Sequence, residues 1–248
     1  MSCMFTNKVK FFKNKKILIT GFSSGIGKKT CLELLKMGAT LILVGRKKNI
    51  FKDYKNTHFF EVDLNEIENL KKKIQSISKK FKKIDGFVHS AAQNQSKNID
   101  KISVLDWTRI INVNLTSAFI ICKELKKNFK RSKKSSIVLI SSIAGHRKSV
   151  VSGVHYVASK SGIIGLTKQL SHEFGKEKIR INCISPSQTL TPMLKKSMTK
   201  NQMNSLQKNI PLQRFAETQE QSNVIIFLLS ELSSYIHGTS INVDGGQL

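Results

Sequence analysis

The sequence predicts an α/β fold: one doubly wound, Rossmann-type sheet of seven parallel strands with helices on both faces. Short apolar runs alternate with longer segments of helical spacing along almost the whole chain, which is the pattern of successive βαβ units. The runs are nearly continuous in apolar residues, as strands covered on both faces are. Apart from an excess of lysine, no linker, repeat or low-complexity tract interrupts them, so residues 1–248 are expected to form a single domain.

Each predicted element is bounded by turn residues or by a change of periodicity. The first strand ends where three glycines fall within seven positions, and a segment of helical spacing follows. The predicted strands cover residues 15–20, 40–44, 57–62, 84–92, 136–142, 179–185 and 240–243. The predicted helices cover residues 26–37, 64–81, 104–128, 156–174 and 218–229.

The composition favours a soluble protein with a substantial core, since 40% of the residues are apolar. No segment reaches the run of about 18 apolar residues that a membrane-spanning helix needs. The basic N-terminal residues lack the apolar stretch of roughly 7–15 residues typical of a signal peptide. We therefore expect a cytoplasmic protein without a membrane partner.

The formal net charge of +26 raises the question of nucleic-acid binding. Only six of the 42 basic residues are arginines, and the few aromatic residues are not interleaved with the basic runs. Nucleic-acid sites usually combine clustered arginine and lysine with aromatic side chains for stacking. We interpret the charge as a solvated, lysine-rich surface that attracts anionic ligands, and expect no specific nucleic-acid partner.

The four cysteines are Cys3, Cys31, Cys122 and Cys183, and none forms a C-x-x-C pair. With this spacing neither a disulfide framework nor a metal site is expected. The last three fall within predicted helices or strands, where we interpret them as small buried apolar side chains.

A glycine-rich turn, TGFSSGIG over residues 20–27, joins the first predicted strand to the first predicted helix. Glycine allows the positive φ that a sharp turn needs, and its missing side chain lets the backbone approach a phosphate at a helix N-terminus. A tight turn needs glycine in any case, so the motif alone leaves a structural and a binding interpretation open. Its place in the first βα unit is where a dinucleotide fold holds the pyrophosphate.

A second group of residues, further along the chain, suits acid–base chemistry. Tyr156 and Lys160 are four residues apart on a predicted helix and therefore share one face. A cation near the Tyr156 hydroxyl would lower its pKa from about 10 and make it a usable acid or base near neutrality. Ser142 ends a predicted strand, and its hydroxyl could bind a carbonyl oxygen.

The spacing T-G-x-x-x-G-x-G, followed in order by Asn114, Ser142 and the pair Tyr156 and Lys160, resembles the short-chain dehydrogenase/reductase family over nearly the whole chain. The resemblance implies a single dinucleotide-binding oxidoreductase domain. It also implies reversible hydride transfer between a nicotinamide and the carbonyl or alcohol carbon of a small-molecule substrate. The family is commonly tetrameric or dimeric, so a homotetramer or homodimer is expected.

The resemblance assigns a catalytic role to four residues. Ser142 would orient the substrate oxygen, and Tyr156 would donate or accept the proton. Lys160 would bind the nicotinamide ribose and lower the pKa of Tyr156. Asn114 would support a water that links Lys160 to solvent.

The resemblance also implies which residues bind the cofactor: Gly21, Ser23, Ser24, Gly25, Ile26, Gly27, Arg46, Asp63, Ala91, Tyr156, Lys160, Thr189 and Thr191. Gly21 would make the turn, Gly25 would admit the pyrophosphate, and Gly27 would permit close helix–sheet packing. Asp63 matches the position that contacts the adenine. Thr189 and Thr191 match the segment beside the nicotinamide carboxamide.

NADP(H) is the expected cofactor, with NAD(H) as the alternative. Chains that bind NAD usually carry an acidic residue at the end of the second strand. Gly45 stands there in this chain, followed by Arg46, Lys47 and Lys48. An arginine binds a 2′-phosphate through a charge-assisted fork, although these cations could also be plain surface charge.

Two segments depart from the family pattern. The family's N-N-A-G reads HSAA at residues 89–92, and its P-G after the sixth strand reads Pro186-Ser187. We interpret His89 as a structural substitute rather than a catalyst. Ser187 either stiffens its loop or adds a hydroxyl near the nicotinamide.

The substrate is expected to be set by the loop after Ser142 and by a covering segment at about residues 189–211. The loop covers residues 143–155 and carries His146, Arg147, Lys148 and His155. These basic residues could meet an anionic substrate, such as an acyl-carrier thioester or a nucleotide-linked sugar, or could be solvated. The covering segment carries the apolar residues Met193, Leu194, Met198 and Met203, which we interpret as one face of a lid. A cofactor-binding pseudoenzyme or scaffold without turnover is the alternative to an enzyme.

Overall fold

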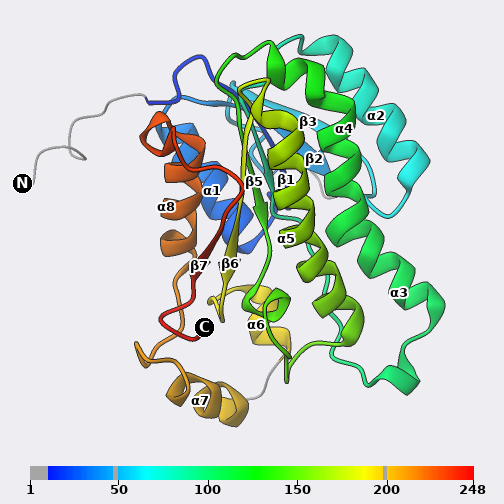
Figure 1. The fold of residues 1–248 in the computed structure, drawn as a ribbon, viewed down its shortest axis with the longest axis vertical. Coiled ribbons are helices and arrows are strands. Elements are labelled where there is room, and N and C mark those ends of the chain that lie inside the picture. The colour runs from blue at the N-terminus through cyan, green and yellow to red at the C-terminus, as the bar shows by residue number, and fades with distance from the viewer. Residues whose placement is uncertain (1–10, 47–49, 198–199) are drawn as a thin grey trace, which may run out of the picture.

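The computed structural model describes residues 11–46, 50–197 and 200–248; Cys3, Lys47, Lys48 and Met198 lie outside these ranges. Its centre is one sheet in the order β3-β2-β1-β4-β5-β6-β7 (Figure 1). All neighbouring strands are parallel. The strands are β1 (Lys16–Thr20), β2 (Thr40–Gly45), β3 (Thr57–Glu61), β4 (Gly86–His89), β5 (Ser136–Ile140), β6 (Arg180–Pro186) and β7 (Ser240–Val243). The predicted fold class is confirmed.

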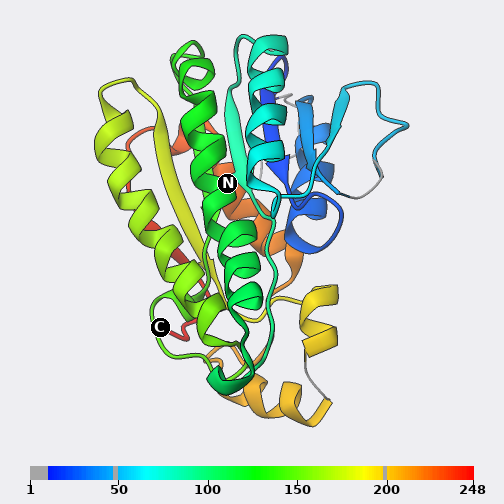
Figure 2. The ribbon, with the colours of Figure 1, turned by 90° about the vertical axis from the view of Figure 1, so that its right-hand side faces the viewer.

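Helices cover both faces of this sheet. In Figure 1, α1 and α8 lie on one side, and α2, α4 and α5 lie on the other. Both views place α6 and α7 beyond one end of the strands (Figures 1 and 2). The helices are α1 (Gly25–Lys36), α2 (Ile67–Lys80), α3 (Val104–Ile111), α4 (Ser117–Lys130), α5 (Val154–Gly175), α6 (Pro192–Ser197), α7 (Lys200–Lys208) and α8 (Thr218–Leu229).

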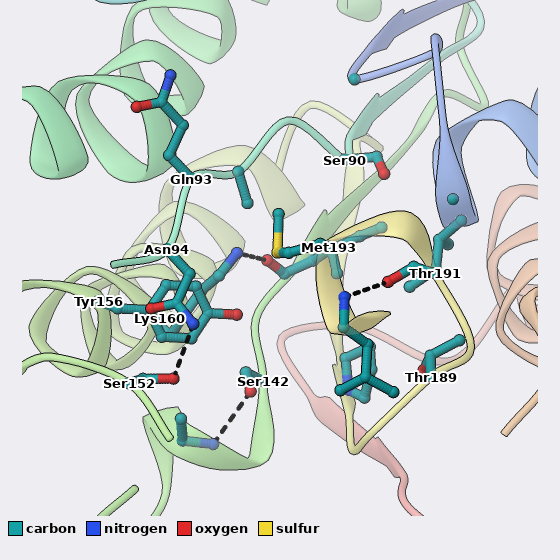
Figure 3. Close-up of a pocket in the computed structure, with 18 of the residues that line it drawn as sticks. Ser90, Gln93, Asn94, Ser142, Ser152, Tyr156, Lys160, Thr189, Thr191 and Met193 are labelled. Carbon is teal, nitrogen blue, oxygen red and sulfur yellow. Dashed lines mark hydrogen bonds between the residues drawn. The ribbon is translucent and has the colours of Figure 1, made fainter. Parts of the chain in front are cut away.

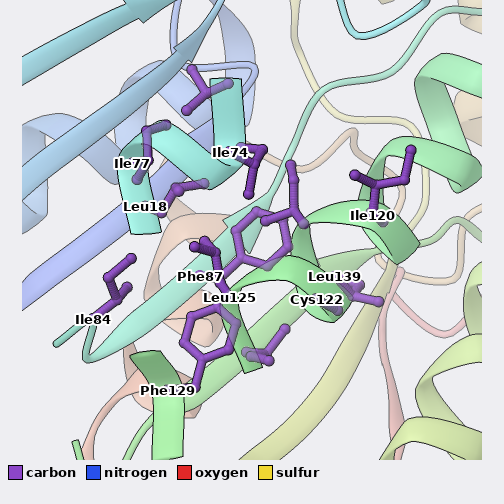
Figure 4. Packing of buried hydrophobic residues seen from close by; sticks show 14 of the residues in the cluster. Leu18, Ile74, Ile77, Ile84, Phe87, Ile120, Cys122, Leu125, Phe129 and Leu139 are labelled. Carbon is purple, nitrogen blue, oxygen red and sulfur yellow. The ribbon is translucent and has the colours of Figure 1, made fainter. Parts of the chain in front are cut away.

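Two hydrophobic cores, one on each face, explain the continuous apolar strands. Successive side chains of a strand point to opposite faces. In β4, Phe87 packs in the core under α2 and α4, whereas the next residue, Val88, packs in the core under α1 and α8. Figure 4 shows Phe87 beside Ile74 of α2 and Leu125 of α4. Both faces are buried, so neither offers room for alternating polar residues.

The strand order reverses between β1 and β4. From β1 the chain winds outward to β2 and β3, and then returns to place β4 on the other side of β1. Loops that leave β1 and β4 therefore diverge, and a crevice opens at the carboxyl ends of these strands. The glycine-rich turn and the loop after β4 border this crevice.

The predicted helix 104–128 is interrupted, which corrects the expectation of one continuous helix. A π-helical turn, Asn112–Thr116, separates α3 from α4. Asn114 lies inside this turn, and its side chain binds both backbone polar groups of Gln93 instead of facing solvent. These tertiary bonds hold the wider turn in place.

Candidate active site

A cavity of about 670 Å³ lies at the carboxyl ends of the strands and is shown in Figure 3. It brings together most of the residues predicted for the site: Gly21, Ser23, Ser24, Gly25, Ile26, Arg46, Asp63, Ala91, Ser142, Tyr156, Lys160, Thr189 and Thr191. Gly27 and Asn114 are not among the residues that line it. Residues up to 170 positions apart in sequence thus meet in one crevice, because parallel strands end at the same edge.

The glycine-rich turn packs so closely that two of its glycines have no room for a side chain. Gly21 has φ +70°, and a Cβ there would overlap the backbone of Ser90 and Ala91. A Cβ on Gly27 would overlap the carbonyl oxygen of Gly21. The first turn of α1 is therefore seated directly on the end of β1.

The N-terminus of α1 suits an anion. Ser24 is the N-cap residue of α1, and within the described residues its side chain makes no capping hydrogen bond to the helix. The first turn of α1 carries no acidic residue. The free N–H groups and the helix dipole would stabilise a pyrophosphate at this point. The open crevice beside the turn, the missing Cβ atoms and the uncapped helix together fit a dinucleotide.

Arg46 and Asp63, both predicted to contact the cofactor, bind each other. Arg46 Nη1 lies 3.4 Å from Asp63 Oδ2, and Asp63 Oδ1 also accepts a hydrogen bond from the Asn65 backbone. The Arg46 side chain is half exposed, so this ion pair is weak and open to competition by a phosphate. Arg46 therefore lies at the cavity with its guanidinium group directed toward the Asp63 carboxylate.

Tyr156 and Lys160 project from the first turns of α5, as their spacing predicts. The Lys160 side chain is 1% exposed, and its Nζ donates to the carbonyl oxygen of Ile140, 2.7 Å away. The same Nζ lies 5.6 Å from the centre of the Tyr156 ring. Ser142 follows β5, and its Oγ accepts a hydrogen bond from the Ala144 backbone.

The electrostatics of Tyr156 differ from the expectation. Burial raises the pKa of Tyr156, and a hydrogen bond from Ser142 opposes that rise without cancelling it. Burial also lowers the pKa of Lys160 to about 8. The expected lowering of the Tyr156 pKa by Lys160 is not found, because the ammonium group is directed at the Ile140 carbonyl. Tyr156 is therefore held as a neutral phenol.

Asn114 is fully buried, and its side chain is already bonded. Its Oδ1 accepts from the Gln93 backbone N–H at 2.8 Å. Its Nδ2 donates to the Gln93 carbonyl and to Ser159 Oγ, each at 3.0 Å. The side chain therefore ties the loop after β4 to α5.

His89, at the end of β4, is fully buried next to this group. Its Nδ1 lies 2.9 Å from Thr20 Oγ1. Burial, together with the nearby charge of Lys160, lowers the pKa of His89 to about 3. The imidazole is therefore neutral at physiological pH.

The pH dependence of the free energy of unfolding should reveal that the His89 imidazole is buried and neutral. Between pH 6.5 and 3 the histidine is protonated in the unfolded chain, whereas His89 in the folded protein stays neutral. The free energy of unfolding of the wild type therefore falls as the pH falls through this window. Each pH unit should cost the wild type about 1.4 kcal/mol relative to His89→Asn. Chemical denaturation of both proteins at several pH values measures the difference. A difference that stays constant from pH 6.5 to pH 3.5 would contradict a neutral His89.

Several cavity residues were not predicted from the sequence: Gln93, Asn94, Gln188 and Gln247. Asn94 Nδ2 donates to Ser152 Oγ at 3.1 Å, close to Tyr156 (Figure 3). Gln93 and Asn94 follow the end of β4, so the rule that ligands bind at strand ends could have found them. Nothing in the sequence around Gln247 signals its place at the cavity.

The buried cysteines agree with their interpretation as apolar side chains. Cys31, Cys122 and Cys183 are free and buried, and burial raises the pKa of Cys122 to about 12. In the described part of the chain, no three His, Cys, Asp or Glu side chains group closely enough to hold a metal. Of the helices within that part, none is long and apolar enough to cross a membrane.

The seven-stranded sheet, the glycine-rich turn and the Ser142, Tyr156 and Lys160 group define a nicotinamide-dependent oxidoreductase. A family model described as enoyl-(acyl carrier protein) reductase matches residues 21–247, and the chain belongs to the short-chain dehydrogenase/reductase family. It is an enzyme that uses NAD(P)H to reduce a carbonyl group, which disfavours the alternative of a scaffold without turnover.

Two relatives and one solved structure show the extent of the similarity within the family. The chain is 32% identical over 243 residues to the 3-oxoacyl-[acyl-carrier-protein] reductase FabG of Aquifex aeolicus, covering 94% of this chain and 97% of the relative. It is 30% identical over 244 residues to the acetoacetyl-CoA reductase of an Acinetobacter species, with 94% and 98% covered. The solved structure of ElxO with NADP bound is 30% identical and superposes with a TM-score of 0.85, covering 94% of this chain and 98% of that one.

Proposed function

We propose that this protein uses NADPH to reduce the 3-oxo group of an acyl thioester to a hydroxyl group. The observation that carries the proposal is the single cavity that holds Ser142, Tyr156 and Lys160 beside an anion-binding turn, with two cations on its substrate side. Relatives named for 3-oxoacyl-carrier and acetoacetyl-CoA reduction support the substrate class.

The residues of the turn and of the strand ends would hold the dinucleotide. Its pyrophosphate would lie against the N-terminus of α1, where Gly21 and Gly25 have positive φ and leave the backbone bare. Thr189 and Thr191 also line the cavity, and the Thr191 side chain lies close to Gly25. The bound nicotinamide would supply the hydride that reduces the carbonyl carbon.

The protein's own groups would place the substrate oxygen and supply its proton. Ser142 would donate a hydrogen bond to this oxygen and orient it. Tyr156, kept protonated by its raised pKa, would donate the proton as negative charge develops there. Lys160, whose pKa burial lowers to about 8, would then help to restore the proton of Tyr156 near neutrality.

Turnover with a thioester tests this proposal directly. NADPH oxidation is followed by absorbance with acetoacetyl-CoA, with acetoacetate ethyl ester and with simple ketones of similar size. The thioester should show the highest kcat/KM. Faster turnover of a neutral simple ketone than of either 3-oxo compound would overturn the proposed substrate class.

Arg147 and Lys148 favour a substrate with an anionic tail. Both line the cavity and are exposed, and no ion pair involves them among the described residues. The acidic residue that lines the same cavity is Asp63, which lies on the cofactor side and is paired with Arg46. The substrate entrance therefore carries uncompensated positive charge, which would attract the phosphates of a coenzyme A or carrier thioester.

The double variant Arg147→Ala/Lys148→Ala should raise KM for acetoacetyl-CoA about tenfold, the loss of one charge-assisted contact. KM for the neutral ethyl ester should stay unchanged, because that substrate carries no phosphate. Arg131→Ala/Lys133→Ala, an exposed pair outside the cavity lining, is the matched control. An equal rise in KM for both substrates would mean that the two cations maintain the structure of the loop and do not bind the phosphates.

We propose NADP(H) as the preferred cofactor because Arg46 lies at the cavity and its partner, Asp63, holds it only loosely. Arg46→Ala should therefore lower kcat/KM for NADPH about tenfold and leave that for NADH unchanged. Arg109→Ala, an exposed arginine on α3 outside the cavity lining, serves as the control. A wild type that turns over faster with NADH than with NADPH would reverse the assignment.

Segment 189–211 is proposed to cover the substrate within a single domain. Met193, Leu194 and Leu206 line the cavity, and Leu194 packs with Ile210 and Phe215 in a small core of its own. A homodimer or homotetramer is also proposed, since Val104 and Leu105 expose most of their apolar surface on α3.

A further inference from the structure

The substrate loop, residues 143–155, is held firmly where it begins. Its first three residues form a 3₁₀ turn directly after Ser142. Ser161 Oγ of α5 donates a hydrogen bond to the Gly145 carbonyl at 2.9 Å. The turn also packs closely on α5, because a Cβ on Gly145 would lie 2.9 Å from the carbonyl oxygen of Lys160. Helix α5 therefore fixes the position of the turn and of Ser142 beside it.

The middle of this loop, residues 146–151, is bonded to the rest of the fold through one side chain. His146 Nε2 lies 2.9 Å from Ser185 Oγ and 3.2 Å from Ser240 Oγ, and the two serine hydroxyls lie 2.9 Å apart. Val150, by contrast, is 81% exposed. Within the part of the chain that the structure describes, no other side chain of residues 146–151 forms a hydrogen bond or an ion pair with a different element. His146 is therefore the hydrogen-bonded anchor of this part of the loop.

The anchor joins the loop to two neighbouring strands. Ser185 is buried on β6, and Ser240 begins β7. Pro186, the residue after Ser185, lines the same cavity as Arg147. The contact does not depend on which ring nitrogen carries the proton, because an unprotonated Nε2 accepts from a serine hydroxyl and a protonated Nε2 donates to a serine oxygen. The loop is thus tied to a second segment of the cavity wall with either form of the imidazole.

We propose that His146 is a positioning residue: its contact with the two serines holds the middle of the loop so that Arg147 and Lys148 stay in the cavity lining. The role rests on the proposed function, because a thioester with phosphates is the substrate that would use these two cations. An ordered loop loses less conformational freedom when a ligand binds, so anchored cations bind a phosphate more tightly. Since α5 holds Ser142 independently, loss of the anchor should weaken substrate binding and leave the reaction at the carbonyl carbon intact.

Two substitutions of His146 separate its Nε2 contact from the rest of the side chain. The amide of glutamine can occupy the place of Nε2, whereas the shorter asparagine brings its amide only to the place of Nδ1. His146→Gln should therefore keep the contact, and His146→Asn should lose it. Ser185→Ala/Ser240→Ala removes the same contact from the other side and leaves the loop sequence unchanged. Ser171→Ala is the matched control, because this hydroxyl donates to the Lys168 carbonyl within α5.

Limited digestion with trypsin tests the anchor without turnover. Trypsin cuts after arginine and lysine, and Arg147 and Lys148 are exposed within the loop. Cutting after these two residues should be about fivefold faster in the serine double variant and in His146→Asn than in the wild type, because a loop without its anchor opens more often. His146→Gln should be cut there at the wild-type rate.

The reference for this digestion is the cut after Arg131, an exposed residue at the end of α4, whose rate should be the same in every variant. Ser171→Ala should match the wild type at both places. An unchanged rate of cutting after Arg147 and Lys148 in the serine double variant would overturn the proposal, since the loop would then be held without His146.

Kinetics test what the anchor does for the substrate. In His146→Asn and in the serine double variant, KM for acetoacetyl-CoA should rise about threefold to fivefold, part of the loss expected when both cations are removed. The value of kcat and the KM for the neutral ethyl ester should stay unchanged, and His146→Gln should recover the wild-type KM. A fall in kcat with both substrates would reject the proposal, because the histidine would then support Ser142 and not the cations. If the wild type reduces no acyl thioester, the proposed function fails, while the digestion still decides whether His146 anchors the loop.

Discussion

Tyr156→Phe should bind NADPH as the wild type does and turn over about 10²–10⁴-fold more slowly, the usual contribution of a placed proton donor. The half-buried phenol lies beside Lys160 with its pKa raised, so at neutral pH it carries the proton that we propose it donates to the substrate oxygen. Phenylalanine fills the same space and removes only the hydroxyl. Fluorescence titration measures cofactor affinity, and absorbance of NADPH measures turnover.

The control is Tyr235→Phe, the same chemical change at a side chain that is fully exposed. It should leave kcat, KM and NADPH affinity within error of the wild type. Turnover of Tyr156→Phe within threefold of the wild type would remove Tyr156 from the reaction. A lost affinity for NADPH with intact folding would instead assign the hydroxyl to cofactor binding.

Gly27→Ala should lower the free energy of unfolding by about 1–3 kcal/mol and weaken NADPH binding more than tenfold. The added methyl would overlap the carbonyl oxygen of Gly21, a backbone atom that no side-chain rotation can move away. Relief would require α1 to lift from the end of β1. The N–H groups at the start of α1 would then leave their position beside the cavity.

Gly165→Ala is the matched control, because Gly165 is also a helical glycine but a Cβ there meets no atom within 4 Å. This variant should gain up to about 1 kcal/mol from helix propensity. The two substitutions therefore have opposite expected signs, measured by urea unfolding and by NADPH titration. A Gly27→Ala protein as stable as Gly165→Ala would show that α1 can move without cost.

The fold could be predicted from the sequence because both faces of the sheet are buried. Residues such as Phe87 and Val88 must both be apolar when adjacent residues enter different cores, so the strands stand out from their flanks. The turn at Gly21 and Gly27 could also be predicted, because only glycine fits where two backbone segments lie in direct contact. The spacing of Tyr156 and Lys160 placed them on one helical face, as the structure has them.

What could not be predicted depends on how side chains pair across the fold. The ion pair between Arg46 and Asp63 joins loops after two different strands, and single residues give no sign of it. The raised pKa of Tyr156 follows from burial and from the direction of the Lys160 ammonium group, neither of which spacing determines. The π turn was hidden because its apolar residues continue the helical pattern on both sides.

The π turn also bears on how this chain can change in evolution. An α-helix advances about 100° per residue, so deleting one residue from Asn112–Thr116 would restore a regular helix and rotate α4 by that angle against α3. The apolar side of α4 would then turn away from the sheet. Loops usually accept insertions and deletions, whereas this segment should accept exchanges of residue type and reject any change of length.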